Sequence, residues 1–522
     1  MIQSAKIASQ PAQLKDGRTR TRYDLHIQVL LGPDWVAQVV LGVLLTTSVV
    51  VAFLTGNTYD SGDSILHYLY AHWAWKHPEN LLNNWAKPLF TLLAAGPAYF
   101  GFLGMKLFQC GIVAWSAWLA YTCARQLRLP WPALAIVFCY AAPDYFRIQY
   151  SGLTEPLFGL ILVGAVATAL RGQLRLSAAV LSGLPLVRSE GMALWGLWAV
   201  YLIWQREWRA LPWLGLGIAV FSVVGGFFQN FNFAWLFTDS PYAFHSPYGS
   251  GHWRHFIDHF PTLLGWSLTV LLLVGAGYTL RRMLRPASWR EPLFGREVLL
   301  LDGSIVLFTL VQSVLWAYGL FGSFGMLRTM TTLVPLCAVV CLSGLAALSG
   351  LATRPAAQGR VLAGGTLLVI ILLFARDYGI RREDGGLIGS SGNLHWRRDF
   401  SMPGDLQVAD QATAWLQRHN PDWKWRPLAY EHPYYPMAMD VDQFNPATRA
   451  SLITPQGNSN IDGMPVGSYV FWDEFWAAGS GKLSLEAISH DTRYREIWHG
   501  EVPQSAYDPN WQRRCIIYER VK

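Results

Sequence analysis

The sequence predicts a polytopic α-helical membrane protein with about eleven transmembrane helices, followed by a small α/β domain. Three observations lead to this fold class. Of the 522 residues, 52% are hydrophobic and only 14% are charged, whereas charged residues usually make up about 25% of a soluble domain. Long apolar runs recur as far as residue 376, and from about residue 385 the chain is polar to its last residue. These features exclude an ordinary soluble protein.

A transmembrane helix needs about twenty apolar residues, and shorter apolar helices can be buried within a bundle. We therefore predict spans near residues 34–55, 96–123, 131–146, 153–170, 176–188, 191–204, 211–230, 262–280, 298–320, 329–349 and 361–376. The fifth and sixth are short and could instead form one re-entrant pair. The first span follows a polar, basic segment, residues 1–33, and lacks a clear small-residue cleavage site. We expect it to be an uncleaved helix rather than a removable signal peptide.

The basic residues predict the orientation in the membrane. One set of connections carries eighteen Lys and Arg residues, and the opposite set carries only six: Lys76, Lys87, Arg147, Arg188, Arg254 and Arg328. Because loops rich in Lys and Arg stay on the cytoplasmic side, we expect a cytoplasmic N-terminal segment in a cell membrane. The first long loop, residues 56–95, then lies outside. An odd number of spans also puts the C-terminal domain outside the cytoplasm.

The polar end of the chain, residues 377–522, is predicted to form a linker and a small extracytoplasmic α/β domain after the transmembrane part, residues 34–376. The stretch GGLIGSSGN, residues 385–393, is typical of a linker or loop. Hydrophobic periodicity predicts a helix over residues 406–419, strands over 468–473 and 513–520, and a short helix over 482–489.

Several classes of function find no support in the sequence. The formal net charge is +7, but the basic residues are scattered through short loops, so topology explains it better than nucleic-acid binding. Five of the six cysteines fall in apolar segments, and we expect no structural disulfide. No P-loop, Rossmann fingerprint or nucleophile elbow is present, so nothing indicates soluble nucleotide chemistry.

The sparse charges on the predicted outer face are the candidates for a functional site. They come from loops far apart in the sequence: Asp63, Lys87, Asp144, Glu155, Arg188, Glu190 and Arg328. The first outer loop is the densest source of functional groups. Charged groups near hydrocarbon are costly unless they are used or paired. We therefore expect the bundle to bring these side chains together in one cavity.

The order of short motifs resembles the GT-C membrane glycosyltransferases, in particular the protein O-mannosyltransferase and aminoarabinose transferase branch. That branch has an acidic motif in its first loop and a later KPP-like motif. Here Asp63 in GDSILHY precedes an aromatic-rich stretch and the sequence KPL, which begins at Lys87. Three further motifs extend the resemblance over most of residues 34–350: TEP at 154–156, VRSEG at 187–191 and MLRTMTTLVP at 326–335. The chain has KPL where the branch commonly has KPPL, and GDS where it often has an Asp-Glu pair.

This resemblance implies transfer of a sugar from a polyprenyl-phosphate carrier to an acceptor hydroxyl at the outer membrane face. The acceptor could be a protein, a lipid or a glycan. The implied general base is Asp63, which would take the proton of the acceptor hydroxyl. Lys87 would stabilise the departing phosphate, and Arg328 and Arg188 could add forked contacts to it.

Each of these residues also has a structural alternative. Asp63 could be the N-cap of a helix that follows it, and Lys87 could be a lysine that snorkels at the membrane edge. Arg188 could pair with Glu190 or face lipid headgroups. We expect Glu190 and His67 to contact the substrate.

Two acidic residues lie at the ends of the second outer loop. Asp144 and Glu155 could position the acceptor, share proton transfer or ligate a divalent metal, since carboxylates suit hard cations. No cofactor is certain, and a divalent metal is possible. Alternatively, Asp144 pairs with Arg147, and Glu155 occupies the first turn of a helix before Pro156, where an acid suits the helix dipole.

Histidines at 252, 255 and 259 are spaced i, i+3 and i+7, so one helical face could present them to a metal. The sequence favours polar interface residues or sugar contacts instead, because no cysteine or HExxH pattern accompanies them.

Two rival functions stay open. A transporter or flippase of lipid-linked saccharides would also place aromatic and charged groups in an apolar bundle, although it should show repeat symmetry and charges near the middle of the membrane. No repeat is visible in the sequence. An inactive scaffold with a GT-C-like body is the third possibility.

Overall fold

The computed structural model describes residues 33–350 and 400–522, apart from positions 240, 455, 506 and 507, together with four isolated positions at 359, 364, 365 and 368. The predicted eleventh span, most of the N-terminal segment and the predicted linker lie outside the described residues.

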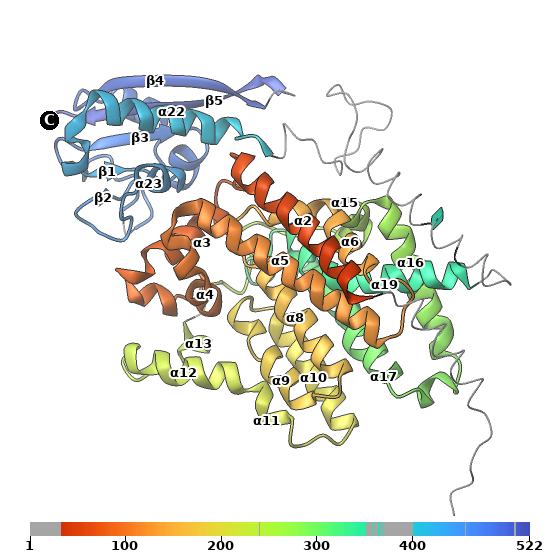
Figure 1. Ribbon diagram of the computed structural model, residues 1–522. Helices are drawn as coiled ribbons and strands as arrows, with labels where there is room; N and C mark the ends of the chain where they lie inside the picture. Colours follow the sequence, from red (N-terminus) through yellow and green to blue (C-terminus); the bar gives the residue numbers. More distant parts are fainter. Residues whose placement is uncertain are drawn as a thin grey trace, which may run out of the picture.

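Helices make up the larger part of the fold (Figure 1). Their bounds are α2 (Asp34–Leu54), α3 (Asp63–His72), α4 (Pro88–Tyr99), α5 (Gly101–Gln126), α6 (Leu134–Ala141), α7 (Pro143–Ile148), α8 (Glu155–Leu170), α9 (Leu174–Leu181), α10 (Gly191–Trp204), α11 (Leu211–Leu214) and α12 (Leu216–Phe228). There follow α13 (Trp235–Thr238), α14 (His255–Asp258), α15 (Phe260–Leu264), α16 (Trp266–Met283), α17 (Phe294–Arg296), the π-helical turn η5 (Glu297–Asp302), α18 (Gly303–Ala317), the 3₁₀ segment η6 (Leu327–Leu333) and α19 (Val334–Ser349).

The predicted count of about eleven spans is not confirmed. Among the described residues, four helical segments are long and apolar enough to cross a membrane: Asp34–Leu54, Gly101–Gln126, Phe294–Ala317 and Leu327–Ser349. Other predicted spans are broken by local backbone chemistry. The run from residue 96 divides at Gly101, whose φ of 84° ends α4 and starts α5. The run from residue 131 divides before Pro143, because a residue that precedes proline is driven out of the helical conformation.

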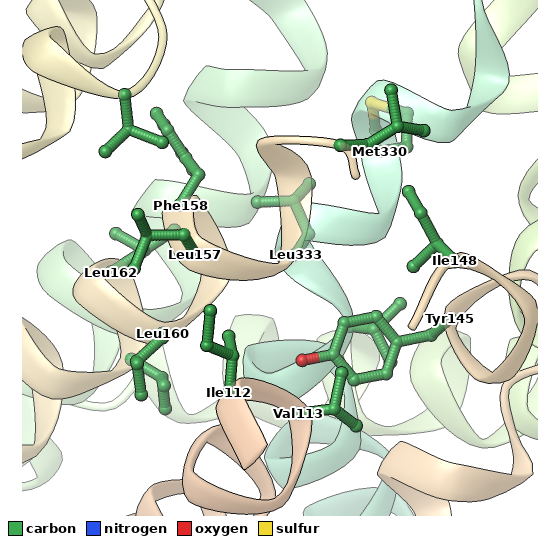
Figure 2. Packing of buried hydrophobic residues seen from close by; sticks show 14 of the residues in the cluster. Ile112, Val113, Tyr145, Ile148, Leu157, Phe158, Leu160, Leu162, Met330 and Leu333 are labelled. Atoms are coloured by element: carbon green, nitrogen blue, oxygen red, sulfur yellow. The ribbon is translucent and has the colours of Figure 1, made fainter. Parts of the chain in front are cut away.

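Apolar side chains of α5, α7, α8 and η6 form a common core (Figure 2). Figure 2 shows Ile112, Val113, Tyr145, Ile148, Leu157, Phe158, Met330 and Leu333 among its members. The contact between α8 and η6 is close, since a Cβ at Gly159 would lie 3.0 Å from the carbonyl oxygen of Thr332. This packing fixes the start of α8 relative to η6, and both elements carry predicted site residues.

The C-terminal α/β region, residues 400–522, contains a five-stranded sheet in the order β2-β1-β3-β5-β4. Its elements are α22 (Gly404–His419), β1 (Leu428–Ala429), α23 (Tyr434–Met439), β2 (Arg449–Ala450), β3 (Tyr469–Asp473), α24 (Leu485–Ser489), β4 (Tyr494–Ser505) and β5 (Asp508–Arg520). β1 pairs in parallel with β2 and β3, whereas β5 pairs antiparallel with β3 and β4. The predicted helices and the two predicted strands, β3 and β5, are present, whereas β1, β2 and β4 were not predicted.

Alternation along β5 gives the sheet two buried faces. Cys515 and Ile517 belong to the core that includes α22, whereas Ile516 and Tyr518 pack in a second cluster with Leu483. This is the period of two that successive strand residues follow.

The C-terminal region docks on α3 and the residues that follow it, within the segment predicted to be the first outer loop, residues 56–95 (Figure 1). The Asp442 carboxylate lies 2.7 Å from Nζ of Lys76 and 2.9 Å from Nε2 of His77. One helical turn earlier, His72 lies 3.2 Å from Asp440. These contacts join two segments that are more than 360 residues apart in the chain.

Candidate active site

The first outer loop enters α3 through a turn that Asp60 builds. Its Oδ1 accepts hydrogen bonds from the backbone N–H groups of Gly62 at 3.0 Å and Ser64 at 2.9 Å. Asp63 is the first residue of α3 rather than its N-cap, and the N-cap is Gly62. The capping alternative for Asp63 is therefore wrong, because Asp60 satisfies these backbone donors. The Asp63 carboxylate is left for other contacts.

A glycine brings the second outer loop against this turn. The backbone N–H of Gly152 donates to Oγ of Ser64 at 2.8 Å. A Cβ at position 152 would lie 2.2 Å from the carbonyl oxygen of Ser64, which no side chain tolerates. The close approach positions the start of α8, with Glu155 as its first residue, beside the start of α3.

Arg328, in η6, joins the acids of both loops. Its guanidinium forms ion pairs with Asp60 and with Asp63. Its Nε lies 3.5 Å from Oε1 of Glu155. Three acidic groups from two loops therefore converge on one arginine, as expected when charges are buried near an apolar bundle.

Arg188 extends this series of ion pairs. It donates to Oε1 of Glu155 at 2.7 Å and to Oε1 of Glu190 at 2.9 Å, so its predicted alternative pairing with Glu190 is present. Gln312 also donates to Glu190, at 3.0 Å. Burial opposes ionisation of Glu190, but the Arg188 guanidinium lowers its pKa to about 2. We call the set Asp60, Asp63, Glu155, Arg188, Glu190 and Arg328 the ion-pair cluster.

The acids of the ion-pair cluster differ in accessibility. The side chain of Asp63 is 39% exposed, whereas that of Glu155 is 1% exposed and lies between the two arginines. Asp60 is intermediate, and burial raises its pKa although Arg328 opposes this shift. Asp63 is thus the carboxylate of this cluster most open to an incoming group, and Glu155 has the geometry of a positioning residue.

Lys87 lies beside the cluster in a constrained backbone conformation. Its φ is 69°, a left-handed value that costs a residue with a Cβ about 1–3 kcal/mol and is typical of functional sites. The side chain is 8% exposed, and its Nζ lies 3.3 Å from Oγ of Ser189 and 4.9 Å from the centre of the Tyr242 ring. Burial lowers the pKa of Lys87 to about 8, while Glu190 acts in the opposite direction. These contacts argue against a lysine that snorkels at the membrane edge.

His67 follows Asp63 by one turn of α3, on the same face. Its ring stacks on Trp85 with centroids 4.8 Å apart and meets the edge of Phe90. Burial lowers its pKa to about 4, so the imidazole is neutral at physiological pH. Within the described part of the chain, its buried Nδ1 has no hydrogen-bond partner. This atom is free to contact a substrate.

Asp144 lies near Arg147, as the structural alternative to a catalytic role predicted. Its Oδ1 accepts a hydrogen bond from the Tyr59 hydroxyl at 3.0 Å and lies 3.6 Å from Nη1 of Arg147. The ring of Tyr59 in turn lies under the Arg147 guanidinium. Asp144 therefore flanks the ion-pair cluster.

The histidine spacing does not build a metal site. His255 Nε2 lies 2.7 Å from the carbonyl oxygen of Gly325, and His259 Nδ1 lies 2.7 Å from that of His255. In the described residues, no group of three His, Cys, Asp or Glu side chains is arranged to hold a metal ion. The possible divalent metal at Asp144 and Glu155 stays a prediction without a ligand set to support it.

Four contributors to this site were not predicted: Asp60, Ser189, Tyr242 and Gln312. Of these four residues, only Asp60 lies in a sequence pattern that could have indicated its role. An aspartate two residues before a glycine and four before a helical serine is typical of a side chain that caps the turn. The other three are recognisable only through their contacts in space.

The sequence matches no protein-family model and no curated protein. Similarity appears among solved structures. ArnT from Cupriavidus metallidurans bound to undecaprenyl phosphate has a TM-score of 0.56 at 14% identity, over 93% of this chain and 98% of that chain. The same protein in the apo state has a TM-score of 0.53 at 13% identity, over 96% and 98% of the two chains. An oligosaccharyltransferase from Archaeoglobus fulgidus, tethered with an acceptor peptide, has a TM-score of 0.47 at 12% identity, over 85% and 70%.

The two ArnT matches span nearly the whole of both chains, including the C-terminal region. The chain therefore shares the fold of ArnT from Cupriavidus metallidurans, which agrees with the architecture that the motif order led us to expect. It is a helical membrane protein with a small C-terminal sheet.

Proposed function

We propose that this protein is an integral-membrane glycosyltransferase that moves a sugar from a polyprenyl-phosphate carrier to the hydroxyl group of an acceptor. One observation carries the proposal: the accessible Asp63 carboxylate is held by Arg328 in the same cluster of loops as the buried Lys87. The shared fold with ArnT, whose structure contains undecaprenyl phosphate, supports a donor of this kind. No metal is required by the groups that we assign.

Asp63 is the proposed general base. As the acceptor oxygen attacks the anomeric carbon, the carboxylate takes the proton of that hydroxyl, and the bond from the anomeric carbon to the phosphate oxygen breaks. The polyprenyl phosphate leaves with the bonding electron pair. The ion pair with Arg328 fixes the orientation of the Asp63 carboxylate. Its exposed side chain allows a hydroxyl to approach.

Lys87 is the proposed phosphate-binding group. A cation beside the departing phosphate stabilises charge that grows in the transition state. In the described residues Nζ contacts the neutral Ser189 hydroxyl and the Tyr242 ring, whereas Arg188 and Arg328 are engaged by carboxylates. Lys87 thus has more capacity for a new anion than either arginine.

The remaining cluster residues position these two groups. Glu155 holds both arginines, and Glu190 holds Arg188 on the side towards Lys87. Arg188 and Arg328 can still reach phosphate oxygens if the donor displaces a carboxylate. His67 offers Nδ1 to a sugar hydroxyl.

In the cell, we place the reaction at the outer face of the cell membrane, with the N-terminus in the cytoplasm and the C-terminal region outside. The excess of basic residues in the alternate connections supports this orientation. The acceptor is a protein, a lipid or a glycan, and the partners are membrane lipids rather than nucleic acid.

The test is a transfer assay with the purified full-length protein. A panel of radiolabelled polyprenyl-phosphate sugars is incubated with wild type, Asp63→Asn and Lys87→Ala. We expect transfer or hydrolysis of one donor by wild type, a loss of about 100-fold or more in Asp63→Asn, and a comparable loss in Lys87→Ala. Asp258→Asn is the matched control, because Asp258 forms an exposed ion pair with Arg254 outside the cluster.

Three results would contradict the proposal, the first of them only in its assignment of the base. Undiminished turnover in Asp63→Asn would show that Asp63 is not the general base. Movement of the lipid-linked saccharide across vesicle membranes without turnover would favour the rival transporter function. Donor binding without any turnover would instead identify an inactive scaffold. In each case Asp258→Asn should behave as wild type.

A further inference from the structure

A cavity of about 170 Å³ lies where the C-terminal region meets the first outer loop. Its lining includes Ser61 from the loop, and Asp405, His432, Asp473 and Trp476 from the C-terminal region. Its volume is below the range of about 300–1,000 Å³ that takes drug-sized ligands. The cavity therefore suits one small group, and Ser61 places it two residues from Asp63.

The first outer loop touches this cavity closely. A Cβ at Gly62 would lie 2.9 Å from Cη2 of Trp476, so the indole ring rests against the glycine that precedes Asp63. A ligand that contacts Trp476 would therefore lie beside the start of α3.

Four polar atoms around the cavity are buried without partners. They are Oδ1 of Asp405, Nε2 of His432, Oδ2 of Asp473 and Nε1 of Trp476, none of which has a hydrogen-bond partner in the described parts of the chain. The side chains of His432 and Asp473 are only 2% and 6% exposed. Each unsatisfied buried polar group costs about 1–3 kcal/mol, and native proteins contain few of them. Four around one cavity indicate that a polar ligand completes their hydrogen bonds.

In Asp473 and His432, the second polar atom of the side chain is hydrogen-bonded to the protein backbone. Oδ1 of Asp473 accepts from the backbone N–H groups of Phe475 at 3.1 Å and Trp476 at 2.6 Å, which leaves Oδ2 as an acceptor for the cavity. Nδ1 of His432 accepts from the backbone N–H of Tyr434 at 3.2 Å. In a neutral imidazole the proton then sits on Nε2, which becomes a donor.

The unpartnered atoms around the cavity are thus two donors, on His432 and Trp476, and two acceptors, on Asp405 and Asp473. Hydroxyl groups match this set, because each can both donate and accept. A metal cation would meet the two N–H donors, and a phosphate would meet the two carboxylates. Two arginines also line the cavity, and both have partners within the protein: Arg513 donates from Nε to Gln504 at 2.6 Å and lies 3.7 Å from Glu474, and Nε of Arg514 lies 3.9 Å from Glu501.

Burial also reduces the charge on two of the groups that line the cavity, His432 and Asp473. It lowers the pKa of His432 to about 4 and raises the pKa of Asp473 to about 7. At neutral pH the histidine is neutral and Asp473 is only partly ionised. The ring of Trp476 lies 5.6 Å from that of His432, and aromatic rings of this kind offer an apolar surface with a polar handle. Both features suit a pyranose ring, which has apolar C–H faces and a rim of hydroxyl groups.

We propose that this cavity binds a sugar residue of the acceptor, so that the C-terminal region holds the acceptor beside the loop that carries Asp63. The identification of the bound sugar as part of the acceptor rests on the proposed glycosyltransferase function. The binding of a sugar, however, can be measured without any transfer. The acceptor would then be a glycan or a glycosylated molecule.

The test is sugar binding by the full-length protein in detergent. Saturation-transfer NMR is recorded with methyl α-D-mannopyranoside, methyl β-D-glucopyranoside and N-acetylglucosamine as probes, and affinity is measured by tryptophan fluorescence. Trp476→Phe keeps an aromatic ring but removes the indole N–H, and Asp473→Asn keeps Oδ1 but replaces the acceptor that faces the cavity. Trp425→Phe is the control, because Trp425 is 88% exposed and outside the cavity lining.

We expect at least one probe to bind wild type and Trp425→Phe, and to bind each cavity variant about tenfold more weakly or not at all. Asp63→Asn should bind the sugar as wild type does, which separates this site from the chemistry of transfer. Thermal unfolding establishes that both cavity variants are folded. No binding of any probe to wild type would overturn the proposal, as would equal binding by the wild type and a folded cavity variant. A failure of the transfer assay alone would overturn the proposed function and leave sugar binding to be judged by these measurements.

Discussion

The pH–rate profile of the transfer reaction should fall on its alkaline side, the alkaline limb, at an unusually low pH, because the rate depends on the protonated form of Lys87. Burial lowers the pKa of its ammonium group to about 8, although the Glu190 carboxylate opposes the shift. If the cation binds the donor phosphate, kcat/KM follows the protonated fraction of Lys87. That fraction is about one half at pH 8 and about one tenth at pH 9. Activity therefore falls as pH rises, since the group loses its positive charge above its pKa.

Two substitutions separate Lys87 from other titrating groups. Lys87→Arg keeps a charge that does not titrate, so the limb near pH 8 should disappear. Glu190→Gln removes a negative charge that favours the ammonium form, so the pKa of Lys87 falls and the limb moves to lower pH. A bound phosphate favours the ammonium form, and the limb in kcat should lie at higher pH than the limb in kcat/KM.

The assay is the initial rate of sugar transfer from about pH 6 to about pH 10 at subsaturating donor. Lys424→Arg is the control, because Lys424 is an exposed lysine of the C-terminal region and should leave the limb unchanged. An unshifted limb in an active Lys87→Arg enzyme would refute the reasoning. A limb that moves upward in Glu190→Gln would refute the assigned sign of the charge interaction.

Two further predictions concern the support of the site. Glu155→Gln neutralises a carboxylate between two buried arginines, and because each arginine keeps another acid, we expect a loss of about 1–3 kcal/mol of stability, measured by thermal unfolding in detergent. Asp442→Asn removes the charge that contacts Lys76 and His77, and hydrogen exchange over residues 72–80 should become faster. In wild type the hydrogen bond to Asp442 raises the pKa of His77, and Lys76 and His77 lower that of Asp442. The docking contact is therefore fully charged from about pH 4 to about pH 6.5 and weakens as pH rises through the raised pKa of His77.

The sequence predicted those parts of the fold that depend on uninterrupted apolar runs. The helix predicted over residues 191–204 is α10 with the same bounds, because Glu190 and a polar stretch after Trp204 flank a continuous apolar segment, but its 14 residues place it among the shorter apolar helices rather than the four candidate spans. The span predicted over residues 96–123 is present as α5, but it begins at Gly101, because this residue separates α5 from α4. Hydropathy averages over a window and is blind to one residue in a left-handed conformation.

Part of the membership of the candidate site was predictable, but its pairing was not. Charges are rare on the predicted outer face, so Asp63, Glu155 and Arg328 could be grouped by their cost near hydrocarbon. Which acid each arginine contacts depends on loop approaches such as that of Gly152 to Ser64, for which the sequence carries no pattern. The cavity of the C-terminal region could not be predicted either, because its lining comes from five separate segments of that region and from Ser61 of the first loop.

The distribution of charge indicates how a donor would orient. Counting Lys87 with the ion-pair cluster gives four carboxylates and three basic groups: Asp60, Asp63, Glu155 and Glu190 against Lys87, Arg188 and Arg328. A donor phosphate adds negative charge to a set that already has an excess of it, so it is best accommodated at the Lys87 end. The carboxylate most open to an acceptor, Asp63, lies at the Arg328 end, and the cavity beside Ser61 adjoins that same end. A sugar carried between them would have its leaving phosphate on one side and the incoming hydroxyl on the other, as an in-line displacement requires.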